Sequence, residues 1–150
     1  MKKSLLLSAA MAMIFSGSAL AEDFATAKDA EALVTQAVKA IAADKDGTLK
    51  AITAKDPKWV HGDLYPFVYN LKGEVVAHGQ NERMVGKNMI ENTDADGKPM
   101  VKERLELAKT KGTFWQDYKW KNPVTKKVEQ KSSYCETKGE LIICAGIYKR

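Results

Sequence analysis

Cysteine and histidine are scarce in this chain of 150 residues, which has two of each. Cys135 and Cys144 are not part of a CxxC or CxxCH motif, and His61 and His78 lie far from them and outside any HExxH segment. The pattern therefore counts against a Cys/His zinc site, a haem attachment site and a zincin active site. No serine lies in a GxSxG nucleophile elbow either, so we expect a protein that is not an enzyme.

Blocks of like charge are also absent, because the 24 basic and 19 acidic residues are interspersed. Such a pattern is typical of a solvated surface and gives no indication of nucleic-acid binding.

A long apolar run occurs only at the N-terminus. Residues 1–21 combine Lys2 and Lys3, an apolar run that ends at Phe15, and the small-residue pattern Ala19-Leu20-Ala21. This is typical of a bacterial secretory signal peptide, and the run is shorter than the roughly 20 residues of a membrane-spanning helix. We predict cleavage after Ala21, a periplasmic protein with no membrane span after cleavage, and a net charge that falls from +5 to +3.

Residues 22–150 are predicted to form one domain. Hydrophobic periodicity, Gly and Pro predict a helix, a short helix, two strands, a helix-containing crossover and three strands. Their expected ranges are Phe24 to about Ala43, a short helix after Asp46-Gly47, a hairpin over 65–79, a helix over 99–111, and strands over 113–120, 126–135 and 140–148. The expected fold class is α+β, with a five-stranded antiparallel sheet, a long N-terminal helix and a helical crossover between strands 2 and 3.

The hairpin over 65–79 is predicted to turn at Gly73, with Asn70 facing Glu74. In that register one face carries Tyr65, Phe67, Tyr69, Val75 and Ala77, and the other carries Pro66, Val68, Val76 and His78. Both faces are apolar, so we expect the hairpin to be covered on both sides.

The two cysteines flank a second predicted turn at Gly139-Glu140. With glycine in the first central position of a type II′ turn, Lys138 faces Leu141, and counting outward places Cys135 opposite Cys144 in a non-hydrogen-bonded pair. Because Cα atoms in such pairs are close enough for a disulfide, and the predicted compartment is oxidising, we predict a Cys135–Cys144 disulfide rather than two free thiols.

Several segments together resemble the single Cache domain. They are residues 63–89 (DLYPFVYNLKGEVVAHGQNERMVGKNM), residues 94–123 (DADGKPMVKERLELAKTKGTFWQDYKWKNP), KSSY at 131–134 and AGIY at 145–148. The resemblance covers about Phe24 to Tyr148. It implies a PAS-like sheet with a small-molecule pocket between the sheet and the 80–112 crossover. It also implies an extracellular sensor, often for small carboxylic acids and usually fused to a chemoreceptor or sensor kinase. Because no second apolar segment or signalling domain follows Arg150, we expect a stand-alone sensor that acts through a partner receptor.

The predicted ligand is a small organic acid, without a metal or cofactor. Candidate ligand-binding residues are Lys131, Tyr134, His78, Tyr118 and Trp115, because a charge and directed donors suit a small anion. Strand alternation places Lys131 and Tyr134 on opposite faces, and likewise Trp115 and Tyr118. Each residue also has a structural alternative: the aromatics can be ordinary core residues, Lys131 a solvated lysine and His78 a hydrogen-bonded core histidine. For the whole protein, the alternative is a non-liganded structural or interaction module.

A calcium loop is the rival interpretation of residues 92–103, because Asn92, Asp94, Asp96-Gly97 and Glu103 match EF-hand spacing. Three features count against a calcium loop. Asn rather than Asp stands at position one, Pro99 at position eight has no backbone N–H, and the preceding segment is too short for an entering helix. A turn that starts the following helix is the favoured interpretation.

Overall fold

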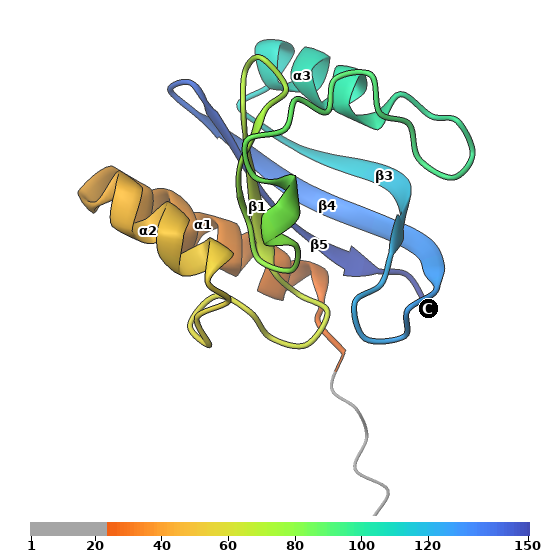
Figure 1. The fold of residues 1–150 in the computed structure, drawn as a ribbon, viewed down its shortest axis with the longest axis horizontal. Coiled ribbons are helices and arrows are strands. Elements are labelled where there is room, and N and C mark those ends of the chain that lie inside the picture. The colour runs from red at the N-terminus through yellow and green to blue at the C-terminus, as the bar shows by residue number, and fades with distance from the viewer. Residues whose placement is uncertain (1–23) are drawn as a thin grey trace, which may run out of the picture.

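The computed structural model describes residues 24–150, and the predicted signal peptide lies outside this part of the chain. Its elements follow the expected order (Figure 1). They are α1 (Ala27–Ala43), α2 (Lys45–Thr53), β1 (Pro66–Asn70), β2 (Val75–His78), the 3₁₀ helix η1 (Glu82–Met84), α3 (Met100–Thr110), β3 (Thr113–Lys121), β4 (Val128–Lys138) and β5 (Leu141–Tyr148).

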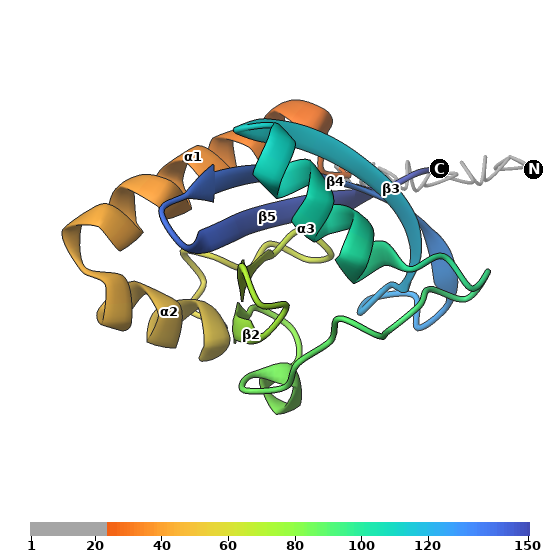
Figure 2. The same cartoon turned by 90° about the horizontal axis from the view of Figure 1, so that it is seen from above.

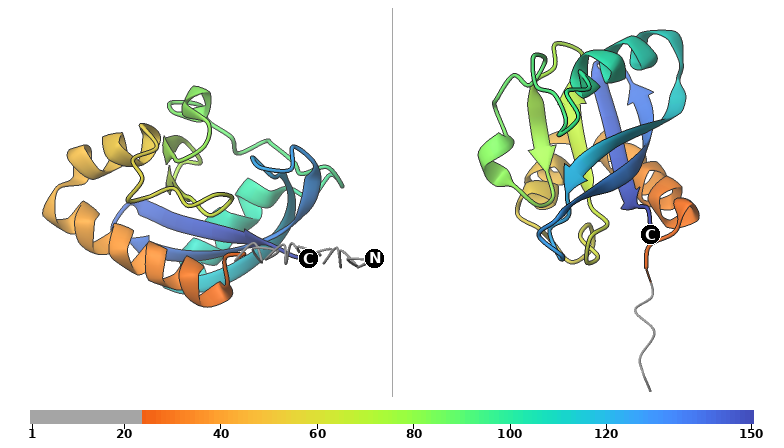
Figure 3. Two further views of the ribbon diagram at one scale, coloured as in Figure 1. Left: turned by 90° about the horizontal axis from the view of Figure 1, so that it is seen from below. Right: turned by 90° about the vertical axis from the view of Figure 1, so that its right-hand side faces the viewer.

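The strands form one antiparallel sheet in the order β2-β1-β5-β4-β3. β1 pairs with the last strand, β5, so the chain's first and last strands are neighbours in the middle of the sheet. α1 lies against one face and α3 lies across the other (Figure 2 and Figure 3). The predicted α+β class and five-stranded PAS-like sheet are confirmed.

Side-chain capping decides where the first two helices begin. The Thr26 hydroxyl accepts from the Asp29 N–H, and the Asp29 carboxylate accepts from the Thr26 N–H at 2.7 Å, so α1 starts three residues later than predicted. α2 starts earlier than predicted because the Asp44 carboxylate accepts from the Gly47 N–H and caps the helix. Within residues 24–150, no helix is both long enough and apolar enough to cross a bilayer.

The sheet separates two hydrophobic cores, because successive strand residues point to opposite faces. The α1 side is filled by Leu33, Val34, Val68, Ile143 and their neighbours. The α3 side is aromatic and includes Tyr65, Phe67, Tyr69 and Tyr118. The β1–β2 hairpin contributes to both cores, so it is covered on both sides as expected.

The register of this hairpin corrects one prediction. Tyr69 pairs with Val75 as expected, but Val68 pairs with Ala77, so Val76 is an extra residue in β2. This bulge shifts the alternation by one residue. Ala77 therefore joins the α1-side core. His78 was predicted to share a face with Val68, but it pairs with Phe67 and lies on the α3 side.

The β4–β5 hairpin has the predicted register, with Lys138 opposite Leu141 and Cys135 opposite Cys144. Gly139 has a φ of +58°, as the first central position of a type II′ turn requires. The predicted Cys135–Cys144 disulfide is present, with Cα atoms 4.1 Å apart. It therefore ties together two strands at the centre of the sheet.

Candidate functional site

A small cavity lies between the aromatic face of the sheet and α3. Its volume is about 10 Å³, which is room for about one water molecule. The lining residues come from β1 to β4, η1 and α3 and their adjoining segments: Tyr65, Phe67, Tyr69, His78, Met84, Met100, Arg104, Tyr118, Trp120 and Lys131. Two flexible methionines lie in this wall, and such side chains adapt readily to a change in cavity shape.

Lys131 brings a buried amine into this cavity. It is only 1% exposed, and its Nζ donates to the Tyr65 hydroxyl at 3.0 Å. The same nitrogen lies 4.1 Å from the ring centre of Tyr65, 5.0 Å from that of Tyr148 and 5.2 Å from that of Phe67. Burial, together with the nearby Arg104 charge, lowers the pKa of Lys131 well below its usual value.

Arg104 brings a permanent positive charge, from the buried side of α3. Its guanidinium lies 5.0 Å from the ring centres of both Phe67 and Tyr69 and 5.2 Å from that of Tyr118. Nε donates to the Gln116 side-chain carbonyl at 3.0 Å, which holds the guanidinium in place. In the described part of the chain, no carboxylate lies within 4 Å of a charged nitrogen of Arg104 or Lys131. Buried charges are normally paired, so the permanent charge of Arg104, beside the amine of Lys131, indicates a site for an anion.

His78 adds a neutral donor. Its Nδ1 accepts from the backbone N–H groups of Gln80 and Asn81 at 3.1 and 3.0 Å. The proton of the neutral ring therefore resides on Nε2. Burial, and then the charges of Lys131 and Arg104, lower the pKa of His78 to about 3. Among residues 24–150 no group accepts a hydrogen bond from Nε2, so this donor is available to a ligand.

Tyr118 and Tyr65 complete the polar lining, and Tyr148 supports Tyr65 from behind it. The Tyr118 hydroxyl shares a hydrogen bond with Ser133 Oγ at 2.9 Å, and burial raises the pKa of Tyr118. The Tyr65 and Tyr148 hydroxyls are 3.3 Å apart, and Tyr148 donates to the Lys121 carbonyl at 3.0 Å. Burial also raises the pKa values of Tyr65 and Tyr148. All three hydroxyls therefore keep their protons at neutral pH.

The structure divides the five predicted ligand-binding residues between the two faces of the sheet. Lys131, His78 and Tyr118 line the same cavity. Tyr134 and Trp115 lie on the opposite face, where their ring centres are 5.5 Å apart and Tyr134 packs against the α1-side core. The strands are regular here, so alternation keeps these two side chains out of the cavity.

The predicted set omits Arg104, although the sequence contains a signal for it. The buried side of α3 comprises Met100, Val101, Arg104, Leu105 and Ala108. An arginine at helical spacing among apolar residues is a charge directed into a core. Alternation places Tyr65 on the correct face but does not identify it as the hydrogen-bond partner of Lys131.

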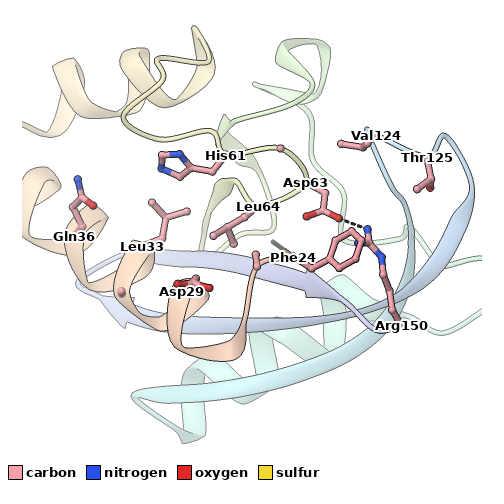
Figure 4. Close-up of a pocket in the computed structure, with 13 residues that line it drawn as sticks. Phe24, Asp29, Leu33, Gln36, His61, Asp63, Leu64, Val124, Thr125 and Arg150 are labelled. Carbon is pink, nitrogen blue, oxygen red and sulfur yellow. Dashed lines mark hydrogen bonds and ion pairs between the residues drawn. The ribbon is translucent and has the colours of Figure 1, made fainter. Parts of the chain in front are cut away.

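A much larger hollow of about 830 Å³ lies outside this core (Figure 4). Its wall includes Phe24, Leu33 and Leu64, and its charged groups already have partners. Arg150 pairs with Asp63 at 2.7 Å, and the Asp29 carboxylate caps α1. The buried cavity is therefore the better candidate for an anion site.

The segment with calcium-loop spacing is a turn before α3. Asp94 accepts from the N–H groups of Asp96 and Lys98, both at 2.9 Å, and from that of Lys119 at 3.0 Å. Hydrogen bonds from these N–H groups, with that of Lys119 foremost, lower the pKa of Asp94. Its carboxylate fastens the turn to the edge strand β3.

Comparisons with known proteins agree with this architecture. A family profile described as a Cache domain, dCache_2, matches residues 58–150. The chain therefore belongs to the Cache domain family, whose members are ligand-binding sensor modules rather than enzymes.

Among individual proteins, the chain is 32% identical over 88 residues to the sensor histidine kinase MctS of Rhizobium johnstonii, covering 57% of this chain and 19% of the kinase. It thus spans about a fifth of that relative. A methyl-accepting chemotaxis protein of Vibrio parahaemolyticus matches with a TM-score of 0.69 and 20% identity, over 81% of this chain and 86% of the other. A Cache chemosensory domain described for carboxylic acid recognition matches with a TM-score of 0.66 and 23% identity, over 82% of this chain and 88% of the other. At these identities the structural matches establish the fold.

Proposed function

We propose that this protein binds a small carboxylate in the cavity between the sheet and α3. The observation that carries the proposal is the buried guanidinium of Arg104, which has no carboxylate partner in the described part of the chain and shares the cavity with the buried amine of Lys131. Leaving a charge buried without a partner is costly, and an anionic ligand removes that cost. The Cache domain described for carboxylic acid recognition supports the same ligand class.

Each polar group has a role in this proposal. Arg104 carries a permanent charge and offers its terminal nitrogens to the carboxylate, while Gln116 holds Nε. Lys131 supplies a second donor, and His78 supplies Nε2–H. Phe67 provides apolar surface next to Arg104 and Lys131, each of which lies within 5.2 Å of its ring centre.

The cavity volume restricts the ligand to a few heavy atoms. About 10 Å³ is less than any carboxylic acid occupies, so binding requires Met84 and Met100 to move outward. Acetate, propionate, lactate and pyruvate are the acids that the proposal favours. The protein releases them unchanged and acts through a membrane chemoreceptor or sensor kinase.

We also propose that the protein is periplasmic, with residues 1–21 as its signal peptide. The disulfide supports an oxidising compartment, and a structural neighbour is a periplasmic sensor domain of a chemotaxis protein. N-terminal sequencing of periplasmic protein checks this proposal: Glu22 is the expected first residue, and retained Met1 contradicts it.

Thermal shift with these acids at millimolar levels, against matched salt, tests the binding proposal. At a hundredfold excess over Kd a ligand stabilises the native state by about 2.7 kcal/mol, which raises Tm by several degrees. Lys131→Met is expected to weaken the shift, and Lys138→Met, an exposed lysine on the same strand, is the matched control. The alternative is a non-liganded interaction module. The small cavity volume is the observation in its favour, and it predicts that no acid raises Tm.

A further inference from the structure

We propose that the Lys131 amine condenses reversibly with the carbonyl group of a small 2-oxo acid in this cavity and captures it as an imine. The inference rests on the proposed function, because the same cavity must first admit a carboxylate. It adds a covalent step that acids without a carbonyl group cannot undergo.

The position of Lys131 distinguishes it from the other lysines of the described chain. All of those are exposed or half-buried, whereas Lys131 is 1% exposed in the wall of the cavity. Every group that faces it lacks a negative charge: the rings of Tyr65, Phe67 and Tyr148 surround Nζ, and Arg104, Tyr118 and neutral His78 line the same cavity. Asp63 is the one acid that raises its pKa, and it is bonded elsewhere, to Arg150.

These surroundings favour the uncharged amine, which is the nucleophilic form. An apolar pocket and a neighbouring cation are the two means by which proteins activate lysine for condensation with carbonyl compounds. Both are present, because aromatic rings desolvate Nζ and the Arg104 guanidinium lies against the same Phe67 ring. Burial and the Arg104 charge accordingly lower the pKa of Lys131.

The second cation also selects the substrate class. If Arg104 holds the carboxylate of a ligand in this cavity, Lys131 is within reach of the atom next to it, since both groups line the same small cavity and lie 5.0 and 5.2 Å from the Phe67 ring centre. In a 2-oxo acid this neighbouring atom is the electrophilic carbonyl carbon. The shared cavity therefore brings the lysine amine within reach of the electrophilic carbon of such an acid.

The reaction balances without an oxidant or reductant. Nζ attacks the carbonyl carbon, a C–N bond forms, and the carbonyl oxygen takes a proton from nitrogen to become a hydroxyl. That hydroxyl leaves as water, and the imine double bond forms. The Tyr65 hydroxyl, 3.0 Å from Nζ, relays a proton from nitrogen to the departing oxygen and recovers its own. When protonated, the iminium lies over the same rings that surround the amine, and hydrolysis reverses the capture.

Reductive trapping tests the inference. The full chain is incubated with pyruvate and sodium cyanoborohydride, and the adduct is mapped by peptide mass spectrometry. The expected result is a single adduct, on Lys131, because a lowered pKa leaves more of the amine in its neutral form at a given pH. Lactate, which lacks the carbonyl, is expected to compete without labelling. Lys131→Arg is expected to lose the adduct, and Lys138→Arg to retain it.

The outcomes separate this inference from the proposed function. If lactate and pyruvate both raise Tm but trapping leaves Lys131 unmodified, imine capture is overturned and carboxylate binding survives. Adducts that are spread over the exposed lysines, without preference for Lys131, also overturn imine capture. If neither acid raises Tm and no adduct forms on Lys131, both proposals fail.

Discussion

Gly146 of β5 lies directly against the side chain of Lys131 on the neighbouring strand β4. A Cβ placed at position 146 would collide with Ser133 Oγ, and it would come within 2.5 Å of Lys131 Cε and 3.0 Å of the Ser132 carbonyl oxygen. The absence of a side chain at this position is therefore what lets the lysine stem cross the sheet face toward Tyr65 and reach the cavity.

Gly146→Ala is expected to destabilise the protein and displace Lys131. Overpacking of a close-packed core costs about 1–3 kcal/mol, and the lysine stem is the group most free to move. Urea unfolding measures the cost. Gly112→Ala is the control, because a Cβ there has no neighbour within 4 Å. Equal stability of the two variants would contradict the close contact.

Arg104→Met is expected to abolish the thermal shift with carboxylates while leaving unfolding free energy unchanged or higher. Replacing an unpaired buried charge with an apolar side chain of similar length removes a desolvation cost, but it also removes the anion's partner. Isothermal titration and urea unfolding on the same variant measure the two effects. Arg83→Met, at an exposed arginine, should change neither. If the Arg104→Met variant binds acids as tightly as the wild type does, the guanidinium is not part of the site.

His78 is expected to make stability depend on pH. Its pKa is about 3 in the folded protein and about 6.5 when unfolded, so the unfolded state binds more protons between these values. Stability is therefore fully present above about pH 6.5 and falls by at most about 1.4 kcal/mol per pH unit below it.

Urea unfolding between about pH 7 and pH 5 measures this effect, because carboxylates titrate mainly at lower pH, and a His78 variant separates it from any slope that the lowered pKa of Lys131 adds. His78→Asn should reduce the slope, since an amide oxygen can accept from Gln80 and Asn81 without titrating. His61→Asn, at the exposed histidine, should retain the slope. A wild-type profile that is already flat in this range would show that His78 is not buried as a neutral ring.

Loss of the Cys135–Cys144 disulfide is expected to cost about 2 kcal/mol, near the low end of the usual range, because the loop it closes is short, with a sequence separation of 9. Thermal unfolding of the protein with both cysteines replaced by alanine measures this cost. Non-reducing mass spectrometry should find the wild type two protons lighter than the dithiol. Two freely alkylated thiols in periplasmic protein would contradict the pairing.

Local signals in the sequence determined most of the fold. Alternation, turn glycines and helical periodicity each act over a few residues, and they predicted the elements, the sheet class and the Cys135–Cys144 register. The disulfide was predictable because a two-residue turn determines every pair counted outward from it. The segments that resemble a Cache domain likewise indicated the family, because their order and spacing are properties of the sequence itself.

The tertiary structure alone decided how the ligand-site candidates are grouped. The bulge at Val76 moved His78 from the predicted face to the opposite one, because one extra residue inverts alternation beyond it. No local pattern placed Arg104 of α3 and Lys131 of β4 against the same Phe67 ring. Their meeting depends on how a helix packs across strands that are distant in sequence, and only that packing reveals that neither cation has a carboxylate partner in the described chain.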